Sequence, residues 1–82
     1  MIPRIAKVQA GPKFTLCVDF DDGKSVVYDV SEDIREVPSF SELATLPGLF
    51  ENFQLDPSRT CVFWNDRIDL PSDSIYEFGK EV

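Results

Sequence analysis

The sequence predicts an α+β fold. We expect a mostly antiparallel sheet of five or six strands, a main helix at about 40–46 and a short C-terminal helix at about 71–78, in the order βββαβββα. Three observations support this prediction. Residues 14–20 and 25–30 alternate apolar and polar side chains, residues 40–46 carry an apolar stripe with helical spacing, and residues 60–64 are rich in β-branched and aromatic types.

The register of the first predicted hairpin can be argued from its two faces. A three-residue loop at 21–23 pairs Val18 with Val26 and Leu16 with Tyr28, which makes one face almost wholly apolar. A two-residue loop would mix apolar and polar residues on each face. We therefore expect the longer loop, with its glycine in the left-handed conformation.

The main helix is predicted from its start and stop signals. Ser39 and Glu42 have the spacing of a capping box, and Pro47-Gly48 ends the pattern. Its apolar stripe consists of Phe40, Leu43, Ala44 and Leu46. The preceding segment, 31–37, is expected to be irregular.

The remaining elements have weaker signals. A first strand at 5–9 precedes a Gly-Pro turn, a short strand at 52–56 precedes a proline-containing turn at 56–59, and a proline and a glycine bound the helix at about 71–78.

The second predicted hairpin turns at Asn65-Asp66. This turn places Phe63 opposite Ile68 on one face and Trp64 opposite Arg67 on the other.

The length suits one domain, 1–82. Surface scaling gives about 5,000 Å² of accessible area for the folded chain and about 13,500 Å² for the extended chain, which supports a single core. The residues predicted to be largely buried are Leu16, Val18, Phe20, Val26, Tyr28, Leu43, Phe53 and Phe63.

The net charge is −7, without histidine, and it is unevenly distributed. Residues 1–24 hold four basic and three acidic side chains, whereas residues 25–82 hold four basic and twelve acidic ones. DNA and anionic membranes repel such a surface, so neither is expected as a direct partner. The acids either solvate a small domain or form an acidic face for a basic partner. No secretory signal and no apolar run of about 20 residues is evident, so we expect a cytoplasmic protein.

Catalytic chemistry is poorly represented. The usual general base, histidine, is missing, the serines occupy turns and helix starts, and the four glycines are isolated. Asp66, Asp69 and Asp73 could hold Mg²⁺ or Ca²⁺ in principle, but their spacing matches no calcium loop. Cys17 and Cys61 are expected to be buried free thiols. We therefore expect no catalytic residue, no metal and no cofactor.

Trp64 and Arg67 form the most distinctive pair on the second hairpin. They are either a cross-strand cation–π contact or the anchor of a partner-binding surface, because Trp and Arg are enriched at interface hot spots. A third alternative packs Trp64 beneath the C-terminal helix. The acids expected around the pair are Asp66 and Asp69, with Glu77 and Glu81 on the C-terminal segment.

Several short motifs follow one another in a distinctive order. They are Ile5-x-x-Val8, Asp19-Phe20-Asp21-Asp22-Gly23, Tyr28-Asp29-Val30, Phe40-x-x-Leu43, Leu49-Phe50, Val62-x-Trp64-x-x-x-Ile68-Asp69-Leu70 and Ile75-Tyr76. This series resembles domain of unknown function 2442, a family of small bacterial proteins.

The resemblance implies an α+β domain built on an antiparallel sheet. It also implies a gene beside that of another small protein, in an arrangement like toxin–antitoxin pairs. Some members add a C-terminal helix-turn-helix, which is not expected in a chain that ends at Val82. The family has no established catalytic residues, and its frequent glycine after the tryptophan is replaced here by Asp66-Arg67.

The leading functional expectation is a non-enzymatic protein-interaction or regulatory module, the antitoxin-like partner of a neighbouring small basic protein. The alternatives are an acidic inhibitor that mimics nucleic acid, of phage origin, and an enzyme that uses carboxylates alone or a metal. We also expect a homodimer, formed through an exposed strand edge, with 53–55 the least protected edge.

Overall fold

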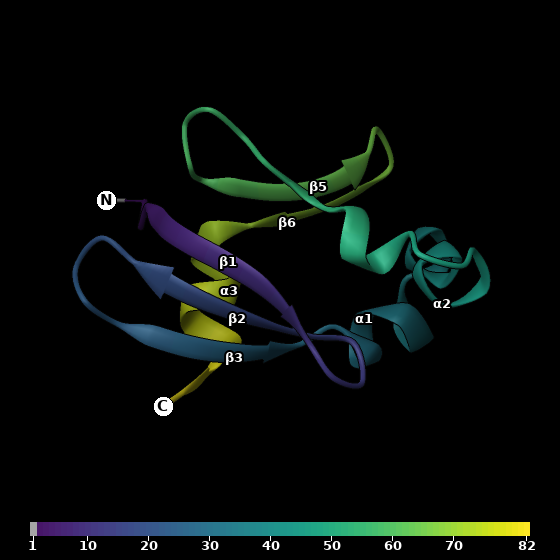
Figure 1. The fold of residues 1–82 in the computed structure, drawn as a ribbon, viewed down its shortest axis with the longest axis horizontal. Coiled ribbons are helices and arrows are strands. Elements are labelled where there is room, and N and C mark those ends of the chain that lie inside the picture. Colours follow the sequence, from purple (N-terminus) through teal and green to yellow (C-terminus); the bar gives the residue numbers. More distant parts are fainter. Residues whose placement is uncertain (1) are drawn as a thin grey trace.

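The computed structural model describes residues 2–82, which form two antiparallel sheets and several short helices (Figure 1). The four-stranded sheet contains, in spatial order, β1 (Ile5–Gly11), β2 (Thr15–Phe20), β3 (Ser25–Asp29) and β7 (Lys80–Glu81). The three-stranded sheet contains β4 (Gln54–Leu55), β5 (Cys61–Asn65) and β6 (Ile68–Pro71). The helices are α1 (Ser31–Glu36), α2 (Glu42–Thr45) and α3 (Ser72–Phe78), with 3₁₀ turns η1 (Pro38–Ser41) and η2 (Phe50–Asn52).

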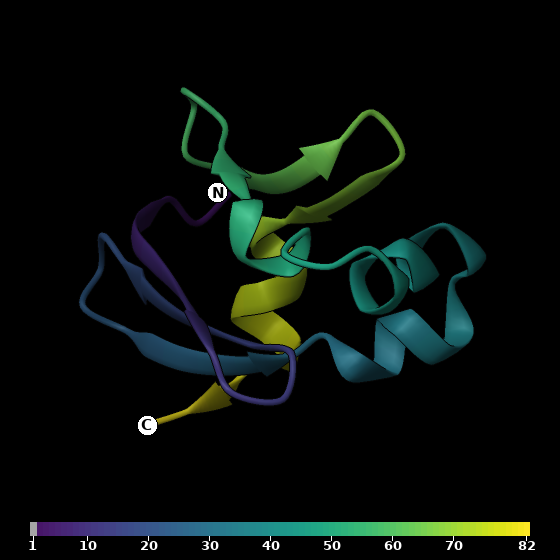
Figure 2. The same ribbon diagram turned by 45° about the vertical axis from the view of Figure 1, so that its right-hand side comes forward.

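The α+β class and the antiparallel pairing are confirmed, but the strands form two sheets instead of one. Helix α3 links the two sheets, and Figure 2 shows it running from the end of β6 to the four-stranded sheet. Ile75 on α3 is fully buried there. Helices α1 and α2 gather with η1 at one end of the molecule, which we call the α1–α2 end (Figure 2).

The first hairpin has the predicted register. Leu16 lies opposite Tyr28 and Val18 lies opposite Val26. The loop has three residues and Gly23 has a φ of 95°, a conformation that is costly for residues with a Cβ. The alternation therefore selected the correct face, since a slip by one residue would have exposed the apolar set.

The second hairpin differs from the prediction by one residue. Val62 pairs with Leu70, and the register shifts between Phe63 and Asn65, so that the turn is 66–67. The side chain of Asn65 holds this turn by accepting hydrogen bonds from the backbone N–H groups of residues 67 and 68. Because Val62 lies opposite Leu70 and faces the core, the alternation along β5 also directs Trp64 inward, and both side chains are buried.

The predicted main helix is broken. Pro38 begins a 3₁₀ turn and α2 contains only Glu42–Thr45, so the expected capping box is wrong and Ser39 forms no cap hydrogen bond. Leu46 lies beyond the helix and is exposed. The segment expected to be irregular contains α1, whose first turn carries two acids. No helix among residues 2–82 is long and apolar enough to cross a membrane.

The C-terminal helix is confirmed to within a residue. Pro71 is its N-cap and Gly79 its C-cap, where the Gly79 N–H donates to the Ile75 carbonyl at 2.8 Å. Beyond it, the two residues of β7 pair with β3, which the sequence did not predict. The expected edge at 53–55 is the two-residue strand β4, and β1 is a longer edge.

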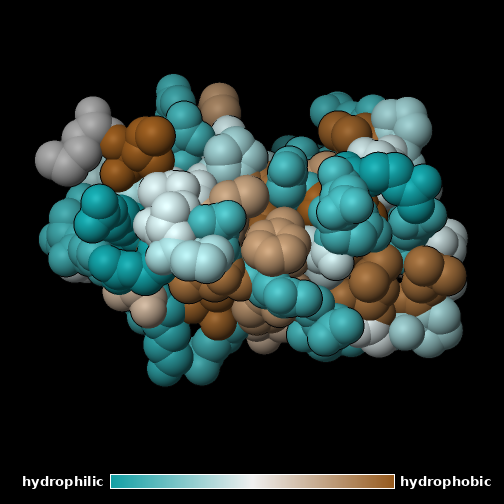
Figure 3. Space-filling model, turned by 90° about the horizontal axis from the view of Figure 1, so that it is seen from above, coloured by the Kyte–Doolittle hydropathy of each residue, from teal (hydrophilic) through white to brown (hydrophobic). Residues whose placement is uncertain are grey.

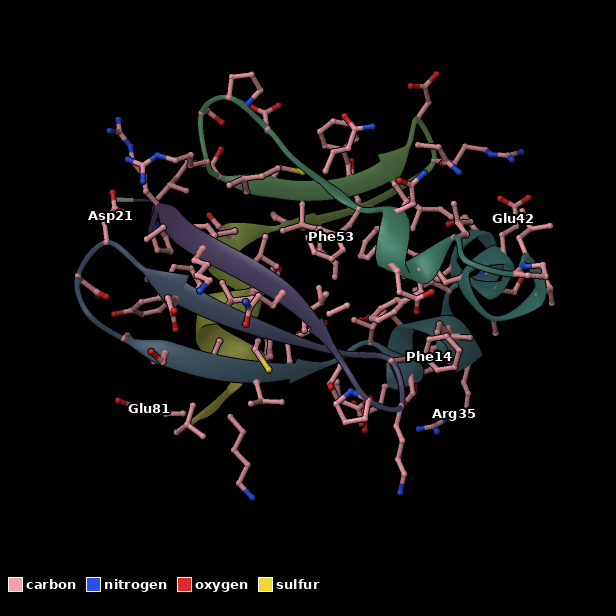
Figure 4. The ribbon with its side chains drawn as sticks, in the orientation of Figure 1. Phe14, Asp21, Arg35, Glu42, Phe53 and Glu81 are labelled. Atoms are coloured by element: carbon pink, nitrogen blue, oxygen red, sulfur yellow. The ribbon has the colours of Figure 1, made fainter. Side chains whose placement is uncertain are left out.

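Five of the eight predicted core residues are buried: Leu16, Val18, Phe20, Val26 and Leu43. The other three, which are Tyr28, Phe53 and Phe63, are partly exposed and pack against the core or lie outside it. Phe63 faces outward because of the changed register. Phe53 lies between the two sheets (Figure 4).

Candidate interaction surface

Trp64 is a core residue and not a surface anchor. It is only 6% exposed, and its indole N–H donates a hydrogen bond of 2.9 Å to the carbonyl of Phe50. Its ring stacks on the Phe50 ring at 6.1 Å and meets the Phe40 ring at 6.4 Å. The expectation of an exposed tryptophan is therefore wrong, and so is the alternative that placed it beneath the C-terminal helix.

The other residues of the predicted site do not surround Trp64. Asp66 and Arg67 form the exposed hairpin tip, and Asp69 pairs with Phe63 on the outer face of β5 and β6. Arg67 reaches Glu42 on α2 at 3.2 Å, with 70% of its own side chain exposed. An ion pair this open contributes at most about 1 kcal/mol.

Of the acids expected from the C-terminal segment, Glu81 lies well away from this tip, near the C-terminus (Figure 4). Glu77 is exposed on α3. The six residues therefore do not form one aromatic centre with an acidic rim.

A groove of about 830 Å³ lies near the N-terminal residues, far from the α1–α2 end. Figure 4 shows Asp21 at this end of the molecule and Glu42 at the other. The floor of the groove is apolar, since Tyr76 meets the ring of Phe20 edge-on at 4.9 Å. Asp21 and Asp22 line it from the turn between β2 and β3.

The charges beside this groove are paired. Arg59 donates two hydrogen bonds to Asp21, at 2.8 and 2.9 Å. The Tyr76 hydroxyl donates to Asp22 at 2.6 Å, and the Lys24 ammonium lies 4.0 Å from the centre of the Tyr76 ring. Arg4 also lines the groove, so two acids face three bases here, and neither sign of charge predominates strongly.

Hydrogen bonds also set the protonation states in this network. The Tyr76 hydroxyl, followed by the backbone N–H of Lys24, lowers the pKa of Asp22. The same contact with Asp22 raises the pKa of Tyr76. At neutral pH the carboxylate is charged and the phenol is protonated. A carboxylate with a lowered pKa is a weak general base, so this network suits structure better than proton transfer.

The acidic surface with exposed apolar groups lies at the α1–α2 end. Residues 31–51 contain five acids and a single base. Val37 and Leu46 are 38% and 50% exposed, and a shallow groove of about 470 Å³ lies beside Leu46 and Leu49. Figure 3 shows hydrophobic side chains among hydrophilic ones at this end.

The sequence analysis also considered a metal site and the state of the two cysteines. Among residues 2–82, no group of three or more Cys, Asp or Glu residues could hold a metal ion. Cys17 and Cys61 are free thiols, but Cys17 is exposed on the outer face of β2 and Cys61 is partly exposed. The expectation that both thiols are buried is therefore wrong.

Comparisons with known proteins identify a family without a known activity. Residues 5–81 match the family model described as "Protein of unknown function (DUF2442)". No curated protein and no solved structure matches the chain significantly. The match spans nearly the whole sequence, as the order of motifs predicted, and the chain therefore belongs to the DUF2442 family.

Proposed function

We propose that this chain is a non-enzymatic protein-binding module, the antitoxin-like regulatory partner of a small basic protein in the cytoplasm. The observation that carries the proposal is the uneven charge, with twelve acids and four bases in residues 25–82. A surface of this kind attracts a basic protein from a distance and orients it during encounter. It also disfavours DNA and membranes, which have the same sign of charge.

The test is co-expression with the product of each flanking gene. We expect one small basic product to co-elute with this chain in size-exclusion chromatography with light scattering, and the complex to weaken between low salt and about 0.5 M salt, because ions screen exposed charges. Failure of every flanking product to co-elute at low salt would contradict the proposal. A partner that DNA displaces from the complex would favour the alternative of an inhibitor that mimics nucleic acid.

A further inference from the structure

Two exposed apolar residues at the α1–α2 end share an unusual backbone setting. Val37 precedes Pro38 and Leu46 precedes Pro47. Both residues follow a short helix and have an extended conformation, with φ and ψ of −107° and 112° at Val37 and −97° and 113° at Leu46. A proline restricts the preceding residue to this region, because its ring clashes with the helical alternative.

The turn after Leu46 fixes the backbone at that residue further. The N–H of Leu49 donates to the Leu46 carbonyl at 3.1 Å, and Gly48 has a φ of 80°. Proline followed by a residue with positive φ is the pattern of a type II turn. Leu46 is therefore held at the surface by the backbone, beside the 470 Å³ groove that Leu49 and Glu51 also line. A group already held in place loses little conformational entropy when a partner covers it.

The charges around these apolar residues are predominantly negative, although Arg35 in the last turn of α1 lies two residues before Val37. From residue 36 to residue 58 the chain contains acids and no lysine or arginine. Glu36 adjoins Val37, and Glu51 lines the groove beside Leu46. Arg67 is the one base that reaches this segment through an ion pair within the described residues, at the partly exposed Glu42.

The exposed apolar residues and the acids around them together indicate what kind of partner would bind here. Two copies of the chain would bring like charges together at this surface, so a second copy is disfavoured. A segment with apolar residues at its centre and Lys or Arg around them would cover Leu46 and its groove and pair with the acids. We propose that the α1–α2 end, centred on Leu46 and the groove beside it, is the docking surface for a cationic amphipathic segment of a protein partner.

This inference rests on the proposed function and refines it. The direct test titrates the ¹⁵N-labelled chain with a synthetic helical peptide of leucine and lysine, amphipathic by design, and follows the amide signals. We expect saturable shifts concentrated in residues 36–52, weakened by salt. Leu46→Ser should weaken binding by about tenfold or more, as the loss of an interface anchor does. Glu51→Gln should weaken it less and should reduce its salt dependence.

Matched controls separate docking from general stickiness and from unfolding. Phe78 is 72% exposed on α3, so Phe78→Ser removes an equally apolar group elsewhere and should leave binding unchanged. The same peptide with glutamate in place of lysine should not bind. Leu46→Met, which keeps the apolar group, should restore binding, and unshifted signals in both sheets should show that each variant is folded.

Several outcomes would overturn the inference. They are shifts centred on Phe78 or on the groove beside Tyr76, equal binding by Leu46→Ser and the parent chain, binding of the glutamate peptide, and no binding of the lysine peptide. The co-expression test has a separate readout. A complex with a flanking gene product that Leu46→Ser does not weaken would overturn this docking surface and leave the proposed function standing. Peptide binding at residues 36–52 without any such complex would leave the docking surface standing and overturn the proposed function.

Discussion

Replacing Trp64 by alanine tests the central correction to the sequence-based prediction. The side chain is 6% exposed, it packs against two phenylalanine rings, and its N–H satisfies the carbonyl of Phe50. Truncating a buried aromatic residue costs about 3–5 kcal/mol in free energy of unfolding. A domain of this length has a total stability of about 4–12 kcal/mol. The variant should therefore lose at least about a quarter of the stability of the chain, and all of it at the lower end of that range.

Trp64→Phe separates the loss of ring packing from the loss of the hydrogen bond to Phe50. Phenylalanine keeps much of the ring contact but cannot donate to the Phe50 carbonyl, so we expect a loss of about 1–3 kcal/mol. Phe78→Ala is the matched control, because a change at a side chain that is 72% exposed should stay within about 0.5 kcal/mol.

The assay is urea denaturation followed by far-ultraviolet circular dichroism, which does not depend on the tryptophan. Equal m-values would show that each variant unfolds the same surface. In the parent chain, the fluorescence of the lone tryptophan should be blue-shifted and resist acrylamide. A loss below about 1 kcal/mol for Trp64→Ala, or strong quenching in the native state, would refute the core assignment.

Three further predictions address packing, pH and assembly. Gly79→Ala should destabilise the chain by about 1–3 kcal/mol, because the new Cβ would lie 2.6 Å from the Ile75 carbonyl oxygen and 2.9 Å from Val26; unchanged or higher stability in urea would contradict this packing. Burial and a bond to a carboxylate raise the pKa of Tyr28, and a similar bond raises that of Tyr76, so both phenols should ionise above their ordinary pKa near 10. Their contribution to stability is present below pH 10 and is lost as the pH rises further, and a titration at 295 nm with normal midpoints would contradict it. The homodimer expected from the strand edges should appear in sedimentation at about 0.5 M salt, where repulsion is screened, and a monomer at both low and high salt would argue against it.

The first hairpin could be predicted because several local signals agreed. Its alternation left one almost wholly apolar face in only one register, and Gly23 suited the loop that this register requires. Local rules also identified α3, where Pro71 and Gly79 bound the helix. In both cases the information lies within a few residues of the element it defines.

The second hairpin could not be predicted by the same rules because two registers satisfied them almost equally. Either of them buries Ile68 and Leu70, and the choice depends on which of Phe63 and Trp64 faces the core. That choice is made by Phe50, 14 residues earlier, whose carbonyl accepts the indole N–H. A sequence pattern does not contain this contact, and a one-residue bulge is invisible to a strict period of two.

The sequence around residues 29–38 does contain signals for helix α1. The Asp29 carboxylate accepts a hydrogen bond from the Ser31 N–H in an Asx turn that leads into the helix, and Glu32 and Asp33 favour the first turn through the helix dipole. Each residue alone is also typical of a loop. Only the combination with Pro38, which ends the segment, indicates a helix of six residues.

The acidic charge of the proposed surface could be predicted from the sequence, but its exposed apolar residues could not. The acidic bias, on which the proposed basic partner rests, is a sum over the sequence, so it does not depend on the register of any strand. The apolar anchor does depend on the register, and the observed pairing of Val62 with Leu70, which turns Trp64 toward the core, removed the expected anchor. Leu46 was assigned to a buried helical stripe, but α2 ends at Thr45 and the following Pro47 holds Leu46 outward in an extended conformation. The Leu-Pro and Val-Pro pairs at 46–47 and 37–38 were therefore the local signals for exposure, and they place the apolar groups within the segment that carries acids and no bases.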